Sequence, residues 1–439
     1  MHIFHCCIGT LERGRATGIL TESLIKEQQR IFFSKLNDWV PSKFRQQLFQ
    51  PILKFYNRKL SRNIPDEYKD EIYALSEYSS TALDYIAPRY ERGLYLHAAH
   101  DIGHAFQDLA LVGCSSFAVK GERSDDGNLI LGRNFDFYVS DDFARNKVVS
   151  FIRPSTGHPF MIVTWPGMIG AVSGMNKEGL TITINAAKSR IPLSAKTPIS
   201  ILAREILQYA ATIDEAVAIA KKRSVFVAES IMVGSAYDND AVLIEVSPGK
   251  LGLCPSVDDQ LICANHFQSL TYQNDRRNRN HILNSHSSYR YERIVQLLNK
   301  SGKMNPSKAA ALLRDKDGID GISLGYGNEK ALNQLIAHHA VIFKPAQRLV
   351  WVSASRYQLG AFVCYDLNEV FGEAGLIQAR NDLSIPGDTF LGTHTYQLYE
   401  AFRVFDRQMD NVISKKSGLT NEFIEQYQSS NPDYWVVYY

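Results

Sequence analysis

Gly113 and Cys114 are the residue pair in this sequence whose types and order most directly allow chemistry. A cysteine thiol can attack the carbonyl carbon of the residue before it, and glycine leaves that carbonyl open to approach. The shift gives a thioester, and its hydrolysis makes the cysteine the first residue of a new chain. The new α-amine, with an ordinary pKa near ~8, can then act as a base for the thiol beside it. The pair predicts self-cleavage that creates a nucleophile, whereas the simpler alternative is a buried structural cysteine.

Side chains that could assist this nucleophile follow at the ends of expected strands. Arg133 and Asp136, in the motif GRNFDF, are of the kinds that hold a thiolate and an ammonium group, although Arg–Asp pairs are usually structural. Asn185 ends the strand-like run LTITIN, where its amide can donate to a developing oxyanion. Each motif alone is weak, so the order in which they occur is the stronger signal.

Further polar positions lie later in the chain. Asn265 ends another strand-like run, and Arg290 stands at an expected helix start, with Arg293 as its alternate. Taken in order, these motifs resemble the family of isopenicillin N acyltransferase (acyl-coenzyme A:6-aminopenicillanic acid acyltransferase), which are autoproteolytic N-terminal-nucleophile (Ntn) hydrolases. The motifs are GCSSFAV, GRNFDF, GMNKEGLTITINAA, ANHF and RYER. The resemblance extends from about residue 11 to residue 366 and reaches, more distantly, choloylglycine hydrolases and acid ceramidase.

The resemblance implies a complete set of site residues. They are Cys114, Arg133, Asp136, Asn185, Asn265 and Arg290, with cleavage between Gly113 and Cys114. In this assignment Cys114 is the nucleophile, and Arg133 and Asp136 orient it and its amine. Asn185 donates to the oxyanion, and Asn265 contacts the amine or the substrate amide. Arg290 is the remaining active-site arginine.

The elements that position these residues are indicated by hydrophobic periodicity. Residues 11–113 have mostly helical patterns, and short strand-like runs joined by tight turns fill residues 111–245. Two helices, further strands and a mostly helical tail follow. Without a β–α–β alternation, this order predicts an α+β fold, a four-layer αββα sandwich of two antiparallel sheets. The expected domains are a helical pro-segment or small chain (1–113), the catalytic core (114–375) and a mostly helical C-terminal extension (376–439).

Local signals fix several expected boundaries. Helices are expected to begin at Asp66, at Pro198 and at Thr212, where Glu215 completes a capping box. Another helix is expected from about Tyr95 to Gln107. A polar, basic loop is expected from Tyr272 to about Ser288.

Composition excludes several classes of function. The formal net charge is +2, from 48 basic and 46 acidic residues, so no overall field attracts nucleic acid. No apolar run approaches the ~18 residues of a membrane span, and the start MHIFHCCIGT does not read as a signal peptide. Six cysteines without a CxxC pair argue against a disulfide scaffold or a zinc ribbon. The expected location is the cytoplasm, or the periplasm or a membrane anchor if the true start lies upstream.

Two groups of side chains have both a functional and a structural interpretation. His100 and His104 share a helix face at a zinc-like spacing, but the missing glutamate and third ligand favour packing or pro-segment docking, and no metal is expected. His338 and His339 could orient a cysteine, but a strand-end pair is the simpler reading. Trp165, Pro166 and Met168 could line an acyl pocket or belong to the core.

The expected activity is attack of Cys114 on an acyl amide or acyl thioester, with transfer of the acyl group to water or to an amine. The best guess for the substrate is a medium or long acyl chain on a small amine. No cofactor is expected beyond acyl-CoA as a possible co-substrate, and the two cleavage products are expected to stay associated. Two alternatives remain: a papain-like hydrolase pairing Cys114 with His266 or His339 without cleavage, and a non-catalytic scaffold of the same fold.

Overall fold

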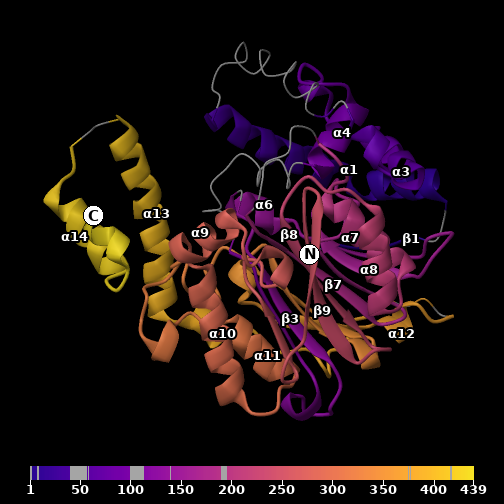
Figure 1. The fold of residues 1–439 in the computed structure, drawn as a ribbon. Coiled ribbons are helices and arrows are strands. Elements are labelled where there is room, and N and C mark those ends of the chain that lie inside the picture. Colours follow the sequence, from indigo (N-terminus) through magenta and orange to yellow (C-terminus); the bar gives the residue numbers. More distant parts are fainter. Residues whose placement is uncertain are drawn as a thin grey trace.

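The computed structural model shows two β-sheets packed between helices, with further helices at one end (Figure 1). It describes residues 2–6, 9–39, 57, 59–98, 113–138, 140–188, 195–373, 375, 377–415 and 418–439. Within these ranges no helix combines the length and the apolar character that a bilayer span needs.

The first sheet has eight strands and the second has six. The first runs in the order β1 (His2–Cys6), β4 (Val148–Ile152), β5 (Phe160–Thr164), β6 (Ser173–Asn176), β7 (Leu180–Ala186), β8 (Glu229–Ser235), β9 (Asp240–Ser247) and β10 (Lys250–Pro255). The second runs in the order β11 (Gln260–Cys263), β2 (Ser115–Val119), β3 (Ile130–Phe135), β12 (His339–Lys344), β13 (Leu349–Ser353) and β14 (Phe362–Asp366). All neighbouring strands are antiparallel except β1 and β4, which are parallel.

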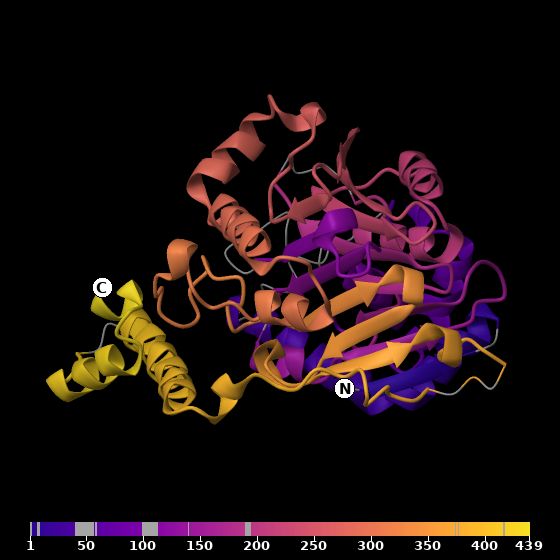
Figure 2. The same cartoon turned by 90° about the horizontal axis from the view of Figure 1, so that it is seen from below.

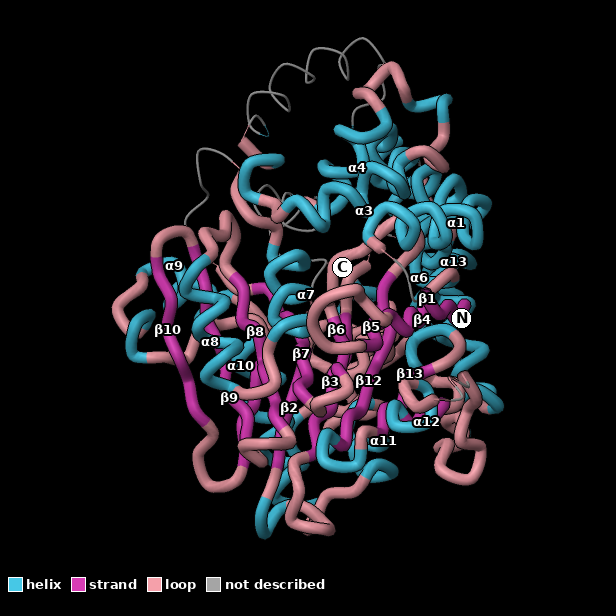
Figure 3. Tube along the Cα trace, turned by 90° about the vertical axis from the view of Figure 1, so that its right-hand side faces the viewer, coloured by secondary structure: helices cyan, strands magenta, loops and turns pink. Residues whose placement is uncertain are grey.

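The sheets stack face to face, and each is covered by helices on its outer face. In β3, Leu131 belongs to the core between the sheets, whereas its neighbour Ile130 packs under the outer helices, since successive strand side chains point to opposite faces. Helices α7 (Ile199–Tyr209) and α8 (Ile213–Lys222) cover the first sheet, and α10 (Ser287–Ser301) and α11 (Pro306–Leu313) cover the second. Figure 3 shows the strands enclosed by these helices. The predicted αββα sandwich is confirmed.

The first hundred residues are mainly helical, as expected, but β1 joins the core sheet, which was not predicted. The helices are α1 (Thr10–Trp39), α3 (Asp66–Ser76) and α4 (Arg89–His97). Helix α3 is shorter than its pattern suggests, because Gln29 of α1 bonds to the hydroxyl of Ser79 and the backbone N–H of Ser80. Helix α4 begins earlier than expected, and residues 99–112, with His100 and His104, lie outside the described residues.

Two elements replace or add to the expected ones after residue 240. Helix α9 (Arg276–Asn284) occupies the expected basic loop, so that prediction was wrong: Asp275 caps this helix by accepting from the backbone N–H groups of Arg277 and Asn278. Strand β10, at the edge of the first sheet, was not predicted, and several of its residues are exposed. The capping box of Thr212 and Glu215 is present as predicted.

The chain ends in helices α13 (His394–Lys415) and α14 (Asn421–Ser430), which lie apart from the sandwich (Figure 1). The short helix α12 (Leu367–Val370) comes before them and packs into the core between the sheets, where Leu367 and Val370 are buried. Figure 2 shows α13 and α14 (yellow) projecting from one end of the body. A separate aromatic cluster that includes Tyr399, Phe402 and Tyr427 anchors them to Leu335 and Tyr357 of the core.

Candidate active site

Cys114 lies immediately before β2, which pairs with β3 in the interior of the second sheet. The antiparallel register places Ser116 opposite Arg133 of β3, which brings the Arg133 side chain to the cysteine. Arg133 Nη2 lies 3.8 Å from the Cys114 sulfur, and the thiol points to the backbone oxygen of Asp136 at 3.9 Å. Cys114 is buried, with 1% of its surface exposed. The pairing of two strands thus assembles three of the predicted residues.

Arg133 is fixed from several sides. Its guanidinium donates to the Ser173 hydroxyl at 2.6 Å and to the backbone oxygens of Val172 and Ile184, and it lies over the Phe135 ring at 4.1 Å. It is fully buried, so its charge acts on Cys114 with little screening by solvent.

Burial favours the uncharged forms of the Cys114 thiol and of the Asp136 carboxyl. Burial raises the pKa of the Cys114 thiol to about 11, and Arg133 offsets this only in part. Burial also raises the pKa of the Asp136 carboxyl to about 7, against the opposing pull of Arg290 and Arg133. Neither carboxyl oxygen of Asp136 has a hydrogen-bond partner among the described residues. A buried carboxyl with this pKa can exchange protons near neutral pH.

Arg290, in the first turn of α10, reaches the Gly113–Cys114 junction. Its Nη1 donates to the carbonyl oxygen of Gly113 at 2.6 Å and to that of Cys114 at 2.8 Å. Asn265 accepts from Arg290 Nη2 at 2.8 Å and donates to the backbone oxygen of Ala186. The alternate, Arg293, forms an ion pair with Asp315 at 2.8 Å. Arg290, and not Arg293, donates to the carbonyl oxygens of the junction.

Asn185 lies at the end of β7, next to the same strand pair. Its side-chain oxygen accepts from the Ser116 hydroxyl at 2.9 Å. Its amide nitrogen donates to the backbone oxygens of Ala264 at 3.1 Å and Cys263 at 3.3 Å. An oxyanion role for Asn185 therefore requires one amide hydrogen to turn from these carbonyls toward the site.

Gln334 was not predicted, yet it contacts the junction directly. Its Nε2 donates to the carbonyl oxygen of Gly113 at 3.0 Å. A Cβ atom added at Gly113 would lie 1.9 Å from the same nitrogen, so the position requires glycine while Gln334 is in place. Gln334 lies in an irregular loop before β12, and no motif or periodicity distinguishes it in the sequence.

The histidines considered in the sequence have partners other than Cys114. His339 bonds to the Ser173 hydroxyl at 2.9 Å and to His338, and His266 bonds to the Ser287 hydroxyl at 2.7 Å. His97 accepts from the backbone N–H of Ile169 at 2.9 Å. The described residues contain no group of three or more metal-ligating side chains.

An aromatic cavity lies beside the site. Trp165, Pro166 and Met168 line it together with Phe137 and Phe143. Its remaining wall comes from α1 and α4 and consists of Gln28, Gln29, Phe32 and Leu96. The Phe135 ring, which lies 4.1 Å from the Arg133 guanidinium, stacks on Phe137 and Trp165 of the cavity wall and so connects the cavity to the site.

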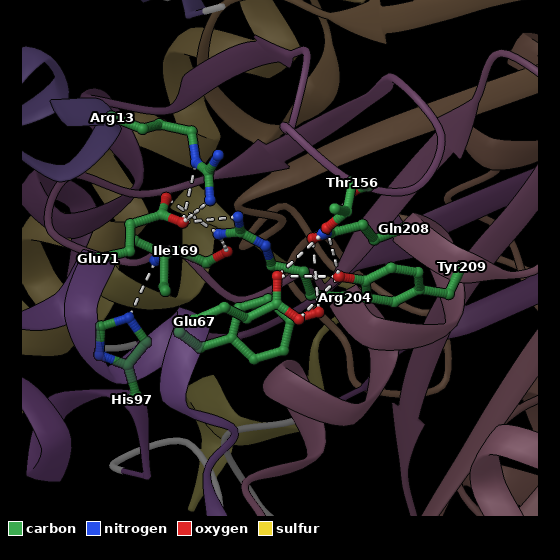
Figure 4. A network of polar contacts seen from close by, with 10 residues as sticks. Arg13, Glu67, Glu71, His97, Thr156, Ile169, Arg204, Gln208 and Tyr209 are labelled. Atoms are coloured by element: carbon green, nitrogen blue, oxygen red, sulfur yellow. Dashed lines mark hydrogen bonds and ion pairs between the residues drawn. The ribbon is translucent and has the colours of Figure 1, made fainter. Parts of the chain in front are cut away.

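A buried ionic network joins the N-terminal helices to the core (Figure 4). Glu71 of α3 pairs with Arg13 of α1 and with Arg204 of α7, each at 2.7 Å. The two guanidiniums, Arg204 first, outweigh burial and lower the pKa of Glu71. Closer to the surface, the Glu67 carboxylate of α3 accepts a hydrogen bond from the Tyr209 hydroxyl of α7 at 2.9 Å.

Two facing sheets with a buried cysteine before an inner strand, and charged groups converging on it, define an enzyme of the Ntn-hydrolase type. The family described as acyl-coenzyme A:6-aminopenicillanic acid acyl-transferase matches residues 122–357. This is more than half of the 439 residues, and the chain belongs to this family. It is an enzyme of the acyl amidase and acyltransferase kind. The matched region begins after Cys114.

Individual relatives are distant. An uncharacterised protein of Archaeoglobus fulgidus is 22% identical over 420 residues, covering 85% of this chain and 67% of that protein. The N-acylethanolamine-hydrolyzing acid amidase of Caenorhabditis elegans is 24% identical over 213 residues, 44% of this chain and 55% of the amidase. This chain thus spans about half the length of that relative. A solved structure of a Caenorhabditis elegans N-acylethanolamine-hydrolyzing acid amidase ortholog has a TM-score of 0.39 at 16% identity, covering 53% of this chain and 93% of that chain.

Proposed function

We propose that this protein cleaves itself between Gly113 and Cys114 and then uses Cys114 as the nucleophile of an acyl amidase or acyltransferase. The observation that carries the proposal is the 2.6 Å hydrogen bond from the buried Arg290 guanidinium to the Gly113 carbonyl. This is the carbonyl that the adjacent thiol must attack. A cation fixed on that oxygen stabilises the negative charge that develops during the attack.

The cleavage step balances within the residues around the junction. The Cys114 sulfur forms a bond to the Gly113 carbonyl carbon, and the thiol proton passes through the Asp136 carboxylate to the Cys114 nitrogen. The Gly113–Cys114 C–N bond then breaks and leaves a thioester with a free α-amine. Water hydrolyses the thioester to a Gly113 carboxylate and the Cys114 thiol. The Asp136 carboxyl, which has no hydrogen-bond partner among the residues that the structure describes, becomes the counter-ion of the new ammonium group.

In turnover, the freed amine serves as base, and Cys114 attacks an acyl amide or thioester to form an acyl-cysteine. Arg133 holds the thiolate, and Asn265 and Arg290 position the substrate amide. Asn185 donates to the oxyanion after one of its amide hydrogens turns toward the site. The acyl group, a medium or long chain, is directed toward the aromatic cavity, which has a volume of about 30 Å³ and must widen to hold it. Water or an amine then receives the acyl group. Acyl-CoA is a candidate donor, and no metal or other cofactor takes part.

The products of cleavage stay associated in this proposal, as a small chain (1–113) and a core (114–375) that carries the C-terminal extension (376–439). Support comes from the Arg13–Glu71–Arg204 network, which is buried across the two parts. The mixed wall of the aromatic cavity, with Phe32 and Leu96 on the small chain, points the same way.

Intact mass measurement of the purified protein tests this proposal. Cleavage after Gly113 divides the 49.5 kDa chain into fragments of about 13 and 37 kDa, and Cys114→Ala should remain whole. A wild-type chain that stays whole for days and yet hydrolyses p-nitrophenyl octanoate would favour the papain-like alternative. A whole and inactive chain, unaffected by Cys114→Ala, would favour a scaffold.

A further inference from the structure

We infer that Gln334 is a catalytic residue of self-cleavage, the second donor to the Gly113 carbonyl, and that the C-terminal extension holds it there. This inference rests on the proposed self-cleavage and adds a residue and a structural requirement to it. Arg290 approaches the carbonyl oxygen from α10 at 2.6 Å, and Gln334 approaches it from the loop before β12 at 3.0 Å. Two donors on one carbonyl oxygen form an oxyanion hole at the scissile bond.

The Gln334 side chain is buried and its amide lies directly against Gly113. Its side chain is 3% exposed, and its amide occupies the space that a Cβ atom at Gly113 would need. When the thiol adds to the Gly113 carbonyl carbon, the carbonyl oxygen becomes an oxyanion. The hydrogen bonds from Arg290 and Gln334 become stronger as the negative charge on this oxygen grows. A donor fixed before the reaction is worth more in a buried site than in water, since it needs no reorganisation.

The backbone around Gln334 is held on both sides. We call residues 322–338 the junction loop. Asn134 of β3 donates to the backbone oxygen of Leu332 at 3.0 Å. Asn333 accepts from the backbone N–H of Leu335 at 3.0 Å, and this bond accompanies a left-handed conformation at Leu335 (φ 54°). Leucine adopts that conformation only where surrounding contacts enforce it.

Those surrounding contacts come from the C-terminal extension. Asn431 clamps the backbone of Tyr326, accepting from its N–H at 3.0 Å and donating to its oxygen at 2.8 Å. Tyr326 stacks on Phe390 with ring centroids 4.9 Å apart. Leu335, next to Gln334, is buried in the aromatic cluster of the extension, where the Tyr399 hydroxyl donates to its oxygen at 3.4 Å.

This arrangement gives the extension a function. It lies beyond residue 357, where the family match ends, and it contacts Tyr326 and Leu335 within the junction loop. Asn431 and Tyr399 are therefore positioning residues that act through Gln334. Self-cleavage then depends on a docked C-terminus, so an unfinished or misfolded chain does not release its nucleophile.

The test is a time course of self-cleavage by gel electrophoresis after refolding of the full chain. Gln334→Met, which keeps the length but removes the donor, should slow cleavage on the order of 100-fold. Gln358→Met is the matched control, because Gln358 is also buried and also donates to a backbone oxygen, that of Leu313, but not at the junction. It should cleave at the wild-type rate even if its melting temperature falls.

Asn431→Ala should slow cleavage about 10-fold, since it displaces the donor without removing it. In a Gln334→Met background the same change should have no further effect on the rate. A merely structural role of Asn431 would instead give additive losses.

Three results would overturn the inference: a wild-type rate in folded Gln334→Met, equal losses in Gln334→Met and Gln358→Met, or additive effects with Asn431→Ala. If Gln334→Met does not fold, Gln334→Asn withdraws the donor by one methylene, and a wild-type rate there has the same meaning. Wild-type protein and Cys114→Ala are run in parallel as a test of the proposed function. If the wild type is not cleaved, self-cleavage itself is refuted; if it is cleaved and Cys114→Ala is not, the results for Gln334→Met bear only on the role of Gln334.

Discussion

Replacing Glu71 by glutamine should test how the N-terminal helices are held to the core. The Glu71 carboxylate is 2% exposed and lies between two guanidiniums that are at most 1% exposed, those of Arg13 and Arg204. Arg13 donates to Oε2 through Nε at 3.0 Å and Nη2 at 2.7 Å, and Arg204 contacts both carboxylate oxygens. Glutamine fits the same space but carries no charge and offers one acceptor oxygen in place of two.

The magnitude follows from what the substitution leaves behind. Removing one partner of a buried ion pair costs about 3–5 kcal/mol, because the remaining charge is buried without compensation. Here two arginines lose their counter-ion, while glutamine retains one acceptor. We expect Glu71→Gln to lower the free energy of unfolding by about 3 kcal/mol.

Urea unfolding in a Cys114→Ala background measures this on one uncut chain. Glu22→Gln is the matched control, since Glu22 lies on α1 in an exposed pair with Lys26 and should change stability by less than about 0.5 kcal/mol. In self-cleaved protein, Glu71→Gln should also release the small chain during gel filtration in moderate urea. A Glu71→Gln loss no larger than that of Glu22→Gln would show that the network does not hold the two parts together.

The pH dependence of the difference is a second readout. The folded-state pKa of Glu71 is lowered from 4.5, so its stabilising effect is complete above pH 4.5 and is lost as the pH falls through the folded value. The gap between wild type and Glu71→Gln should therefore stay constant above about pH 5.5 and close at lower pH.

Four further outcomes are expected. Arg290→Gln should slow self-cleavage about 100- to 1,000-fold by gel assay, whereas Arg293→Gln, which breaks a pair with Asp315, should lower the melting temperature and leave cleavage unchanged. Self-cleavage of the wild type should rise through pH 7, where the Asp136 carboxyl ionises, and Asp136→Asn should be at least about 100-fold slower with no such rise. Burial lowers the pKa of His97 to about 4 from 6.5. As the pH falls, the unfolded chain therefore binds a proton at His97 before the folded chain does, and the free energy of unfolding decreases. Between pH 7 and 5 the free energy of unfolding of the wild type, measured in urea titrations, should decrease by about 2 kcal/mol more than that of His97→Gln. Trp165→Ala, which enlarges the aromatic cavity, should raise kcat/KM for p-nitrophenyl dodecanoate relative to the butyrate, and an unchanged ratio would place the acyl group elsewhere.

Much of the secondary structure could be predicted because local signals determine it. The capping box at Thr212 and the apolar strands β2, β3 and β7 depend on neighbours within a few residues, and each was located correctly. The errors occurred where a distant contact or an unnoticed cap determines the outcome. Helix α3 ends early because α1 binds the residues that follow it, and α9 forms because Asp275 caps an otherwise polar segment.

The candidate site divides in the same way. Cys114, Arg133 and Asp136 belong to one β-hairpin, so their proximity follows from register alone. Arg290 and Arg293 both lie on α10, and three residues of helix separate them by nearly a full turn. Their different partners, Gly113 and Asp315, become evident only when the helix is packed against β2 and α11.

The order of the motifs in the sequence predicted the family and the layered fold, which are confirmed, since these depend on local residue types and on the pattern of strands. The same motifs single out Cys114 as the proposed nucleophile. The tertiary structure alone decided the environment of the junction. Gln334 is 221 positions from Gly113, and nothing near Gln334 in sequence marks it as a donor. Its placement depends on β3, on the strained backbone at Leu335 and on the C-terminal extension, whose Tyr399 is 64 positions from Leu335. Contacts of such separation form only when the whole chain has folded.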